Sequence, residues 1–197
     1  MPLTLASKSK IRAQMLARAG VPFDVKVASV DEAMIKEALL AEGAKPRDIA
    51  DTLAELKAQR VADKGVPGFV LGSDQILEHK GDLLSKPTTP EEAKAQLMRL
   101  AGTTHRLLSA AVLIEDGKPV WRAVTEARLT MRKPTPAYLD DYIHRNWDNI
   151  RHCVGSYQIE GEGARFFVQI TGDTFTVMGM PLLPVLQYLT LRGFLEG

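Results

Sequence analysis

The chain has 197 residues, of which 45% are hydrophobic and 25% are charged, a composition typical of an ordinary soluble globular protein. The net charge is +1, which gives no support for a nucleic-acid or membrane surface, so any anion site must be local. Cys153 is the only cysteine, which excludes an intrachain disulfide and favours a small core residue over a nucleophile. No apolar run is long enough to span a bilayer and residues 1–6 do not read as a signal peptide, so we expect a cytoplasmic protein.

The hydrophobic periodicity predicts a mixed α/β fold, with helices and strands alternating through the first half of the chain. The alternation gives way to a long hairpin near Gly102, which suggests two lobes of one domain spanning residues 1–197. The expected strands are Leu3–Ala6, Phe23–Val27, Phe69–Leu71, Ile76–Glu78 with Leu83–Leu84, Leu107–Ile114, Val120–Met131 and Phe166–Ile170. The expected helices begin near Ile11, Asp31, Pro46, Thr89, Thr135 and Pro181.

Asp74 directly follows a short apolar run that reads as a buried strand. The run covers residues 69–71, and we expect it to end at Gly72 and Ser73. In open α/β sheets, ligands bind beyond the carboxyl ends of the strands, so a strand ending here would place Asp74 well for chemistry. The alternative is that Asp74 is a turn residue with no further role.

A polar segment after the first strand is a candidate anion site. Ser7-Lys8-Ser9 stands at the start of the first helix, and Arg12 lies in the first turn. A helix N-terminus presents free N–H groups and a partial positive charge, which suits a phosphate. A single serine would be explained as a helix cap, whereas hydroxyls and cations together favour anion binding. The glycines of a P-loop are missing.

Two further charged residues, Glu32 and Lys57, have both a structural and a functional interpretation, and a third, Lys86, has a restricted backbone. Glu32 either complements the dipole of its helix or supplies a carboxylate to a metal. Lys57 flanks the buried stripe of its helix and either snorkels to water or points into a cleft. Lys86 precedes Pro87, which restricts it to an extended backbone.

A glycine-rich polar segment at residues 155–163 contains Glu160. Glycines at these spacings indicate either a close approach of backbone to ligand or a flexible loop. His105 and His152 show no metal-ligand spacing.

An ordered set of short motifs runs through the whole chain, and the set is more specific than any one motif in it. In order, the motifs are Leu5-Ala6-Ser7-Lys8-Ser9, Arg12, Asp31-Glu32, Leu53-Ala54 with Lys57-Ala58, Gly72-Ser73-Asp74, Lys86-Pro87, Leu100-Ala101-Gly102 with His105, Gly155-Ser156-Tyr157, Gly172-Asp173 and Gly179-Met180-Pro181-Leu182.

With these motifs the chain resembles the Maf family, the septum-formation-related nucleoside triphosphate pyrophosphatases, from about Leu3 to Gly193. The resemblance implies a fold like that of the inosine-triphosphate pyrophosphatases, a mixed curved sheet with flanking helices and two lobes around a central cleft. It also implies hydrolysis of a nucleoside triphosphate to the monophosphate and pyrophosphate with a divalent cation, Mg²⁺ or Mn²⁺. Related proteins are often dimeric, so a homodimer is an expected assembly, although no exposed apolar stripe identifies its interface.

The resemblance also implies roles for individual residues. The family's presumed proton acceptor matches Asp74, and its acidic metal-binding position matches Glu32, with Asp74 as a second oxygen ligand. The family's phosphate-binding serine, arginine and lysines match Ser7, Arg12, Lys57 and Lys86. The implied catalytic residues are Asp74, Lys86 and Arg12, and the implied substrate-binding residues are Ser7, Lys57, Gln75 and Glu160. Whether Asp74 acts as a base, a metal ligand or both is open.

The substrate base is suggested by departures from one branch of the family. The branch associated with dTTP and UTP has arginine where Ile11 stands, threonine where Gln75 stands and glutamine where Glu160 stands. The chain thus looks like the branch linked to 7-methyl-GTP, although that branch often carries an aromatic residue at Ile11. A glutamate can accept hydrogen bonds from the N1–H and the exocyclic amine of guanine.

Two other functions compete with the pyrophosphatase hypothesis. One is a nucleotide-binding regulator of cell division that acts through a protein partner, as the family's historical name suggests. The other is an α/β domain whose charged residues are all helix caps and surface groups. Nucleotide binding that depends on Lys57 and Lys86 would favour the pyrophosphatase or the regulator over a domain whose charged residues are only caps and surface groups.

Overall fold

A computed structural model describes residues 1–27 and 29–196 and confirms the predicted mixed α/β class. Within the described residues the strands form one seven-stranded sheet in the order β2-β1-β3-β5-β6-β7, with β4 paired to β3. β1 is parallel to both β2 and β3, whereas β4 is antiparallel to β3 and β7 is antiparallel to β6. The strands are β1 (Leu3–Leu5), β2 (Asp24–Val25), β3 (Phe69–His79), β4 (Asp82–Leu84), β5 (Thr104–Glu115), β6 (Lys118–Met131) and β7 (Phe167–Thr171).

Side chains cap the N-termini of α1, α2, α4 and α5. In α2, for example, Asp31 accepts a hydrogen bond from the Met34 N–H at 3.1 Å. Among the described residues, none of the helices combines the length and the apolar character that a bilayer crossing requires. The helices are α1 (Lys10–Arg18), α2 (Glu32–Ala41), α3 (Pro46–Ala62), α4 (Pro90–Leu100), α5 (Pro136–Ile150), α6 (Thr174–Met178) and α7 (Leu182–Leu191), with 3₁₀ turns at Val154–Ser156 and Glu162–Phe166.

The contacts divide the chain into two compact units. Unit 1 comprises Met1–Gln75, Leu108–Thr125 and Thr174–Gly197, and unit 2 comprises Ile76–Leu107 and Glu126–Asp173. β3, β5 and β6 each contribute residues to both units. The expected single domain with two lobes stays a prediction. The predicted central cleft stays a prediction.

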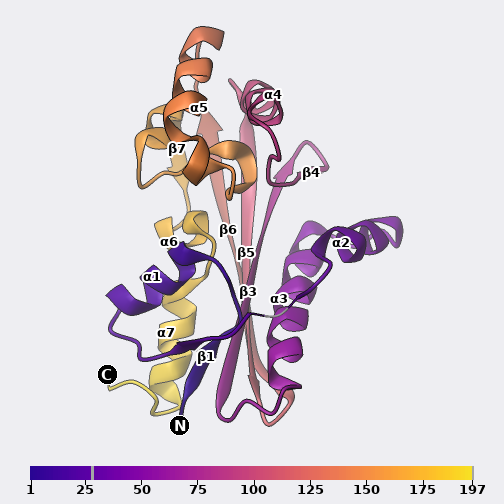
Figure 1. Cartoon of the computed structure of the whole chain (residues 1–197), viewed down its shortest axis with the longest axis vertical. Helices are drawn as coiled ribbons and strands as arrows, with labels where there is room; N and C mark the ends of the chain where they lie inside the picture. Colours follow the sequence, from indigo (N-terminus) through magenta and orange to yellow (C-terminus); the bar gives the residue numbers. More distant parts are fainter. Residues whose placement is uncertain (28, 197) are drawn as a thin grey trace. The chain divides into compact units, whose positions relative to one another are not determined.

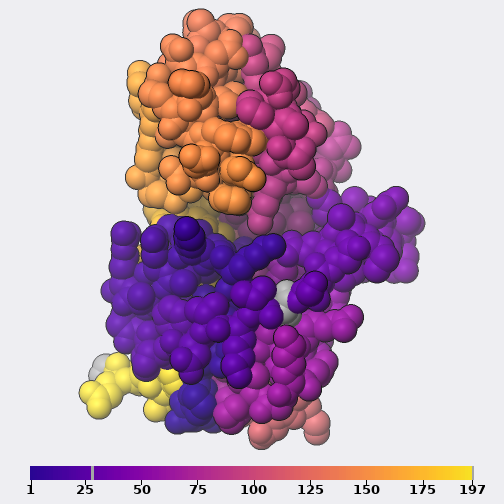
Figure 2. Space-filling model, viewed as in Figure 1, coloured from indigo at the N-terminus to yellow at the C-terminus, as the bar shows by residue number. Residues whose placement is uncertain are grey.

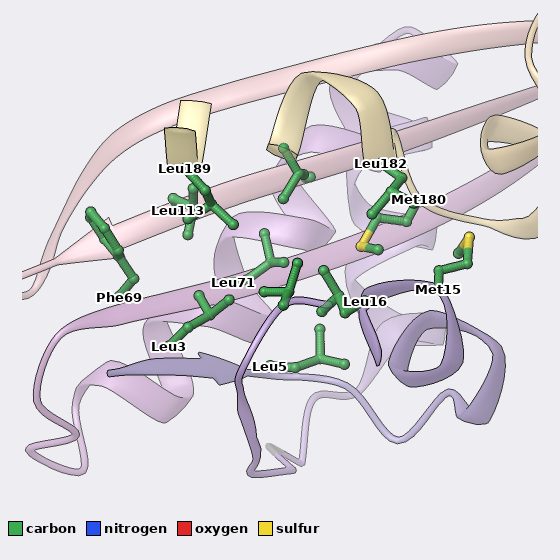
Figure 3. Close-up of a cluster of buried hydrophobic side chains, with 13 residues drawn as sticks. Leu3, Leu5, Met15, Leu16, Phe69, Leu71, Leu113, Met180, Leu182 and Leu189 are labelled. Carbon is green, nitrogen blue, oxygen red and sulfur yellow. The ribbon is translucent and has the colours of Figure 1, made fainter. Parts of the chain in front are cut away.

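In unit 1, helices cover both faces of the strands. Figure 1 shows α1 and α7 on one side of β1 and α3 on the other. Buried apolar residues of β1, β3 and β5 meet α1 and α7 in one cluster, which Figure 3 shows in close-up. The cluster consists of Leu3, Leu5, Met15, Leu16, Val21, Phe69, Leu71, Ala111, Leu113, Met180, Leu182, Val185 and Leu189.

The N-terminal and C-terminal segments of unit 1 lie side by side at the surface, indigo and yellow in Figure 2. Between them is an open pocket of about 480 Å³. The pocket adjoins Pro2 and Leu3 at the start of β1, whereas Ser7 follows the end of β1, so it is not the predicted anion site. It is lined by Met1, Pro2, Leu3, Pro22, Phe23, Asp24, Arg192, Gly193 and Phe194.

The strand expected at residues 69–71 does not end at Gly72. It continues without a break as β3 to His79, so the prediction that Asp74 follows a strand end is wrong. Gly72 is tolerated inside the strand because a helix backbone packs against it. The pairing of β3 with β1 stops at the Leu5–Leu71 pair, so Asp74 still lies three residues beyond the carboxyl end of a parallel neighbour. That neighbour, β1, is the strand that leads into Ser7.

Other boundaries differ in detail from the sequence prediction. The strand expected at 23–27 is reduced to β2, Asp24–Val25. The strand expected at 166–170 begins one residue later, as Phe167–Thr171, because Phe166 ends a 3₁₀ turn. The short helix α6 at Thr174–Met178 has no counterpart in the prediction, since five residues are too few for a clear helical periodicity.

Gly72 allows α3 to approach β3 more closely than any other residue would. A Cβ atom at Gly72 would lie 2.0 Å from the Ala54 carbonyl oxygen and 2.8 Å from the Ala58 nitrogen. Both contacts are to helix backbone, which cannot move aside without displacing α3. The small side chains of Ala54 and Ala58 complete this close contact, and both are fully buried.

We expect Gly72→Ala to lower the free energy of unfolding by about 3 kcal/mol or more, because the new methyl group overlaps helix backbone. Gly161→Ala is the matched control, since a Cβ there meets nothing within 4 Å and the backbone is extended. The control should change stability by less than about 0.5 kcal/mol. Urea unfolding followed by circular dichroism measures both, and equal stability of the two variants would contradict the packing argument.

Candidate functional site

Lys57 joins two carboxylates in unit 1. Its Nζ atom lies 2.5 Å from Asp74 Oδ1 and 2.8 Å from Glu32 Oε1. The three side chains come from three elements, β3, α2 and α3, so the tertiary fold assembles the group. The side chains of Asp74 and Lys57 are only 7% and 12% exposed, whereas that of Glu32 is 43% exposed.

This geometry follows from the approach of α3 to β3. Alternate residues of a strand share a face, so Asp74 points to the same side as Gly72, toward α3. Lys57 lies three residues after Ala54, on the helix face that contacts Gly72. Lys57 therefore points inward and does not snorkel to water. The hypothesis that all charged residues are caps or surface groups is wrong for Lys57 and Asp74.

Arg12 is anchored by backbone carbonyls on the other side of β3. Its Nε atom donates to the Gly179 oxygen at 2.7 Å, and its Nη1 atom donates to the Ser73 oxygen at 2.8 Å. The Ser73 hydroxyl donates to the same Gly179 oxygen at 3.2 Å. Two of the three nitrogens of the guanidinium are thus held by the protein, which fixes the direction of the side chain.

The two serines after β1, Ser7 and Ser9, make different hydrogen bonds. Ser9 Oγ accepts from the Arg12 N–H at 3.5 Å and caps α1, as the capping interpretation predicts. Ser7 Oγ accepts from the Ser9 N–H at 3.2 Å and from Arg12 Nη1 at 3.4 Å. Ser7 thus lies beside Arg12, so the structure brings these two predicted site residues together.

Gln75 is held by the C-terminal part of unit 1. Its Nε2 atom donates to the carbonyls of Thr176 and Val177 at 2.9 and 3.0 Å, and it lies 3.2 Å from Ser109 Oγ. The amide nitrogen is therefore engaged with the protein. A role for Gln75 in substrate binding stays a prediction, with the Oε1 atom as the group that would carry it.

Sequence reasoning missed several residues around Arg12 and Asp74. Ser109 and Thr176 are fully buried, and Ser109 Oγ donates to the Thr176 oxygen at 2.7 Å. The Gly179 carbonyl oxygen accepts a hydrogen bond from Arg12. Gly179 belongs to the motif Gly179-Met180-Pro181-Leu182, but nothing in the sequence indicates that it pairs with Arg12. Lys36 lies near Asp74 and Glu32, and its spacing of four residues from Glu32 is the signal that could have identified it.

Burial and the two carboxylates shift the pKa values of Arg12 and Lys36 in opposite directions. Burial lowers the pKa of Arg12, while attraction to Asp74 and Glu32 opposes the change. Burial likewise lowers the pKa of Lys36, again opposed by Asp74 and Glu32. The guanidinium keeps its charge at neutral pH because its ordinary pKa is so high. The site therefore holds cations that have given up part of their hydration.

The two carboxylates fit a divalent cation that also binds phosphate. Glu32 and Asp74 converge on one point, which the Lys57 ammonium marks in the structure. Mg²⁺ takes hard oxygen ligands and is usually held by one or two carboxylates together with substrate phosphates. Within residues 1–27 and 29–196, no group of three or more His, Cys, Asp or Glu residues could hold a metal ion. The protein alone therefore supplies an incomplete set of ligands.

The remaining predicted site residues, Lys86 and Glu160, belong to unit 2. The charges of both residues act on the thiol of Cys153. Burial raises the pKa of Cys153, which makes it a poor nucleophile, as expected. Cys153 is half-buried, so it is less enclosed than the core residue that the sequence suggests.

The glycine-rich segment of unit 2 is tied down on both sides of Glu160. Glu162 accepts hydrogen bonds from Tyr138, Arg145 and Asn146, and these bonds lower its pKa to about 2. The hydroxyl of Tyr157 lies 2.7 Å from His105 Nε2 in a buried contact. The segment is therefore anchored by specific bonds and is not simply a flexible loop, while Glu160 itself is exposed.

A family model described as Maf-like protein matches residues 2–191 of the chain. The chain belongs to the Maf-like family. The match spans both units and covers every residue that the motifs single out, which agrees with the resemblance found in the sequence.

Curated relatives of this Maf-like chain cover nearly its full length. A protein of Roseobacter denitrificans named nucleoside triphosphate pyrophosphatase is 59% identical over 192 residues, which is 98% of this chain and 96% of that protein. A protein of the same name from Ruegeria pomeroyi is 55% identical over 100% of this chain and 98% of its own. A protein of Brucella abortus named 7-methyl-GTP pyrophosphatase is 42% identical over 99% and 98%.

Among solved structures, a nucleoside-triphosphatase described as a dITP/XTP pyrophosphatase from Mycobacterium abscessus aligns over 100% of both chains, with 14% identity and a TM-score of 0.44.

We expect acid to destabilise the Maf-like chain through His105. Burial, followed by the charge of His79, lowers the pKa of His105 to about 4. In the unfolded chain the His105 imidazole has a pKa of about 6.5, so it binds a proton there that it does not bind in the folded chain. The free energy of unfolding therefore falls as the pH drops from about 6.5 to about 4. The loss from this one group reaches about 3 kcal/mol.

Urea unfolding at several pH values measures this loss. His105→Gln removes the titrating group and should flatten the pH dependence by about 3 kcal/mol, whereas the exposed His152→Gln should leave it unchanged. The same pH dependence in the wild type and in His105→Gln would contradict the assignment.

Proposed function

We propose that the chain hydrolyses a nucleoside triphosphate to the nucleoside monophosphate and pyrophosphate. The observation that carries the proposal is the convergence of Asp74, Glu32 and Lys57, with Arg12 and Ser7 close by in the same unit. A buried acid among cations suits a reaction in which a water must be oriented beside a highly charged triphosphate. The names of the relatives support the same reaction.

In the proposed reaction, water attacks the α-phosphorus, and the bond from this phosphorus to the oxygen that bridges to the β-phosphorus breaks. Asp74 orients the water and accepts its proton. Lys57 binds Asp74 Oδ1. Because both oxygens of a carboxylate carry lone pairs, Oδ2 can accept a hydrogen bond from the water. The electrons of the broken bond leave with pyrophosphate.

The cations hold the phosphates. Arg12 is fixed through Nε and Nη1, which directs the remaining nitrogen, Nη2, as the donor available for a phosphate oxygen. Lys57 can exchange a carboxylate for a phosphate because its ammonium has three donors on a flexible stem. Ser7 and Lys86 complete the predicted phosphate-binding residues.

Glu32 and Asp74 would hold the divalent cation, Mg²⁺ or Mn²⁺. When bound, the cation neutralises charge on the phosphate oxygens and so favours attack at phosphorus. Because these two carboxylates are an incomplete ligand set, we infer that the cation and the triphosphate bind together.

For the base, we propose a purine of the 7-methyl-GTP type, read by Glu160. The support is the exposed glutamate on an anchored segment, Gln75 in place of threonine, and the name of the Brucella abortus relative. The alternative, a regulator of cell division acting through a partner, is not favoured, because the relatives carry the names of enzymes.

We expect Asp74→Asn to reduce kcat by about 100-fold or more, because the amide neither accepts the proton nor orients the water equally well. The exposed Asp148→Asn is the matched control and should retain full activity. Turnover in ¹⁸O-water followed by mass spectrometry should place the label in the monophosphate. Label in pyrophosphate or release of orthophosphate would contradict attack at the α-phosphorus.

We expect Glu160→Gln to lower the ratio of kcat/KM for 7-methyl-GTP to kcat/KM for dTTP by about tenfold, because the amide offers one acceptor in place of two. Steady-state assays of pyrophosphate release on a panel of GTP, 7-methyl-GTP, UTP and dTTP measure the ratio. The exposed Glu91→Gln should leave it unchanged. An unchanged ratio in Glu160→Gln would remove the argument for base selection.

A further inference from the structure

The inner face of α2 contains a lysine where a helix of this kind normally places apolar residues. Although α2 has no fully buried residue, its four half-buried positions, Glu32, Ile35, Lys36 and Leu39, follow the spacing of one helical face. This face is the one that carries Glu32 to Lys57 on α3, and α2 packs against α3. Lys36 is therefore directed toward α3 with Ile35 and Leu39, while its neighbour Glu37 is exposed.

The surroundings of Lys36 are those of the acid–cation group. Lys36 follows Glu32 by four residues, one turn of the helix, so the two side chains are neighbours. Both Asp74 and Glu32 act on its charge, and burial lowers its pKa. A lysine that only covered apolar surface would extend its ammonium to water and would keep its hydration. Lys36 instead keeps its charge close to the residues that the reaction needs.

With Lys36, the group contains more positive than negative charges. Lys57 and Arg12 carry two positive charges, which Asp74 and Glu32 balance. Lys36 makes the group net positive by one charge, before any substrate or metal is present. A half-buried group in which cations outnumber carboxylates favours a polyanion.

We propose that Lys36 is a further substrate-binding residue of this site, where its ammonium contacts the phosphates of the nucleotide. The inference rests on the proposed function for the identity of the ligand and adds a residue to it. As a binding residue, Lys36 acts on the affinity for the triphosphate and for the pyrophosphate product, and it takes no part in activating the water.

The test compares Lys36→Met with Lys36→Arg, which keeps the charge, and with Lys64→Met, which removes an exposed lysine at the end of α3. We expect Lys36→Met to raise KM for the triphosphate by about tenfold with kcat changed by less than about threefold, since one charge-assisted contact is lost. Lys36→Arg should restore most of the affinity, and Lys64→Met should behave as the wild type.

Isothermal titration of inorganic pyrophosphate with Mg²⁺ separates this inference from the proposed reaction, because it needs no turnover. Affinity about tenfold weaker in Lys36→Met than in the wild type supports the inference even if no triphosphate is hydrolysed. Unchanged KM and unchanged pyrophosphate affinity in Lys36→Met would overturn it while leaving the reaction intact. A lower Tm with unchanged affinity would also overturn it, because it would show a structural role only.

Discussion

The candidate site depends on the close contact between α3 and β3 at Gly72. A helix normally packs on a sheet through layers of side chains, but here the Ala54 carbonyl oxygen lies only 2.0 Å from the position that a Cβ atom at Gly72 would take. The contact brings Lys57 down to Asp74, two residues along the same face of the strand, where an ammonium can meet a carboxylate out of water. Removing one partner of a buried ion pair costs about 3–5 kcal/mol, because the other charge is left uncompensated. Separating Lys57 from Asp74 therefore costs free energy, and a charged ligand that separates them must make equivalent contacts with both.

On the other side of β3, polar contacts set the position of Arg12. Alternation along the strand turns Ser73 and Gln75 toward the C-terminal segment, where Gly179 and Thr176 present backbone carbonyls. Arg12 shares the Gly179 carbonyl with Ser73, so the N-terminal helix, the central strand and the C-terminal turn meet at one oxygen. A guanidinium held in this way has lost its rotamer freedom before any phosphate arrives, which lowers the entropic cost of binding.

Together these contacts produce a group of cations and carboxylates whose central pair, Lys57 and Asp74, is largely withdrawn from water. In such surroundings electrostatic interactions are stronger than in water, which benefits a ligand of complementary charge and penalises an unpaired one. Lys57 balances Glu32 and Asp74 in the structure, and a divalent cation with its phosphates could take over that function. The small net charge of the whole chain, +1, is therefore compatible with a strongly charged site, because the charge of the site is local.

The sequence by itself determined the α/β class, most helix starts and the identity of the charged residues, because caps, prolines and hydrophobic periodicity act over a few neighbouring residues. It also identified Asp74, Lys57, Glu32, Ser7 and Arg12 as members of one motif set, although its reason for Asp74, a strand end, was wrong. Only the tertiary structure decided that β3 runs through Gly72, that Lys57 points inward, that Gly179 anchors Arg12 and that Lys36 joins the group. These features depend on pairs of residues up to 167 positions apart, such as Arg12 and Gly179, and no local pattern encodes the approach of two backbones.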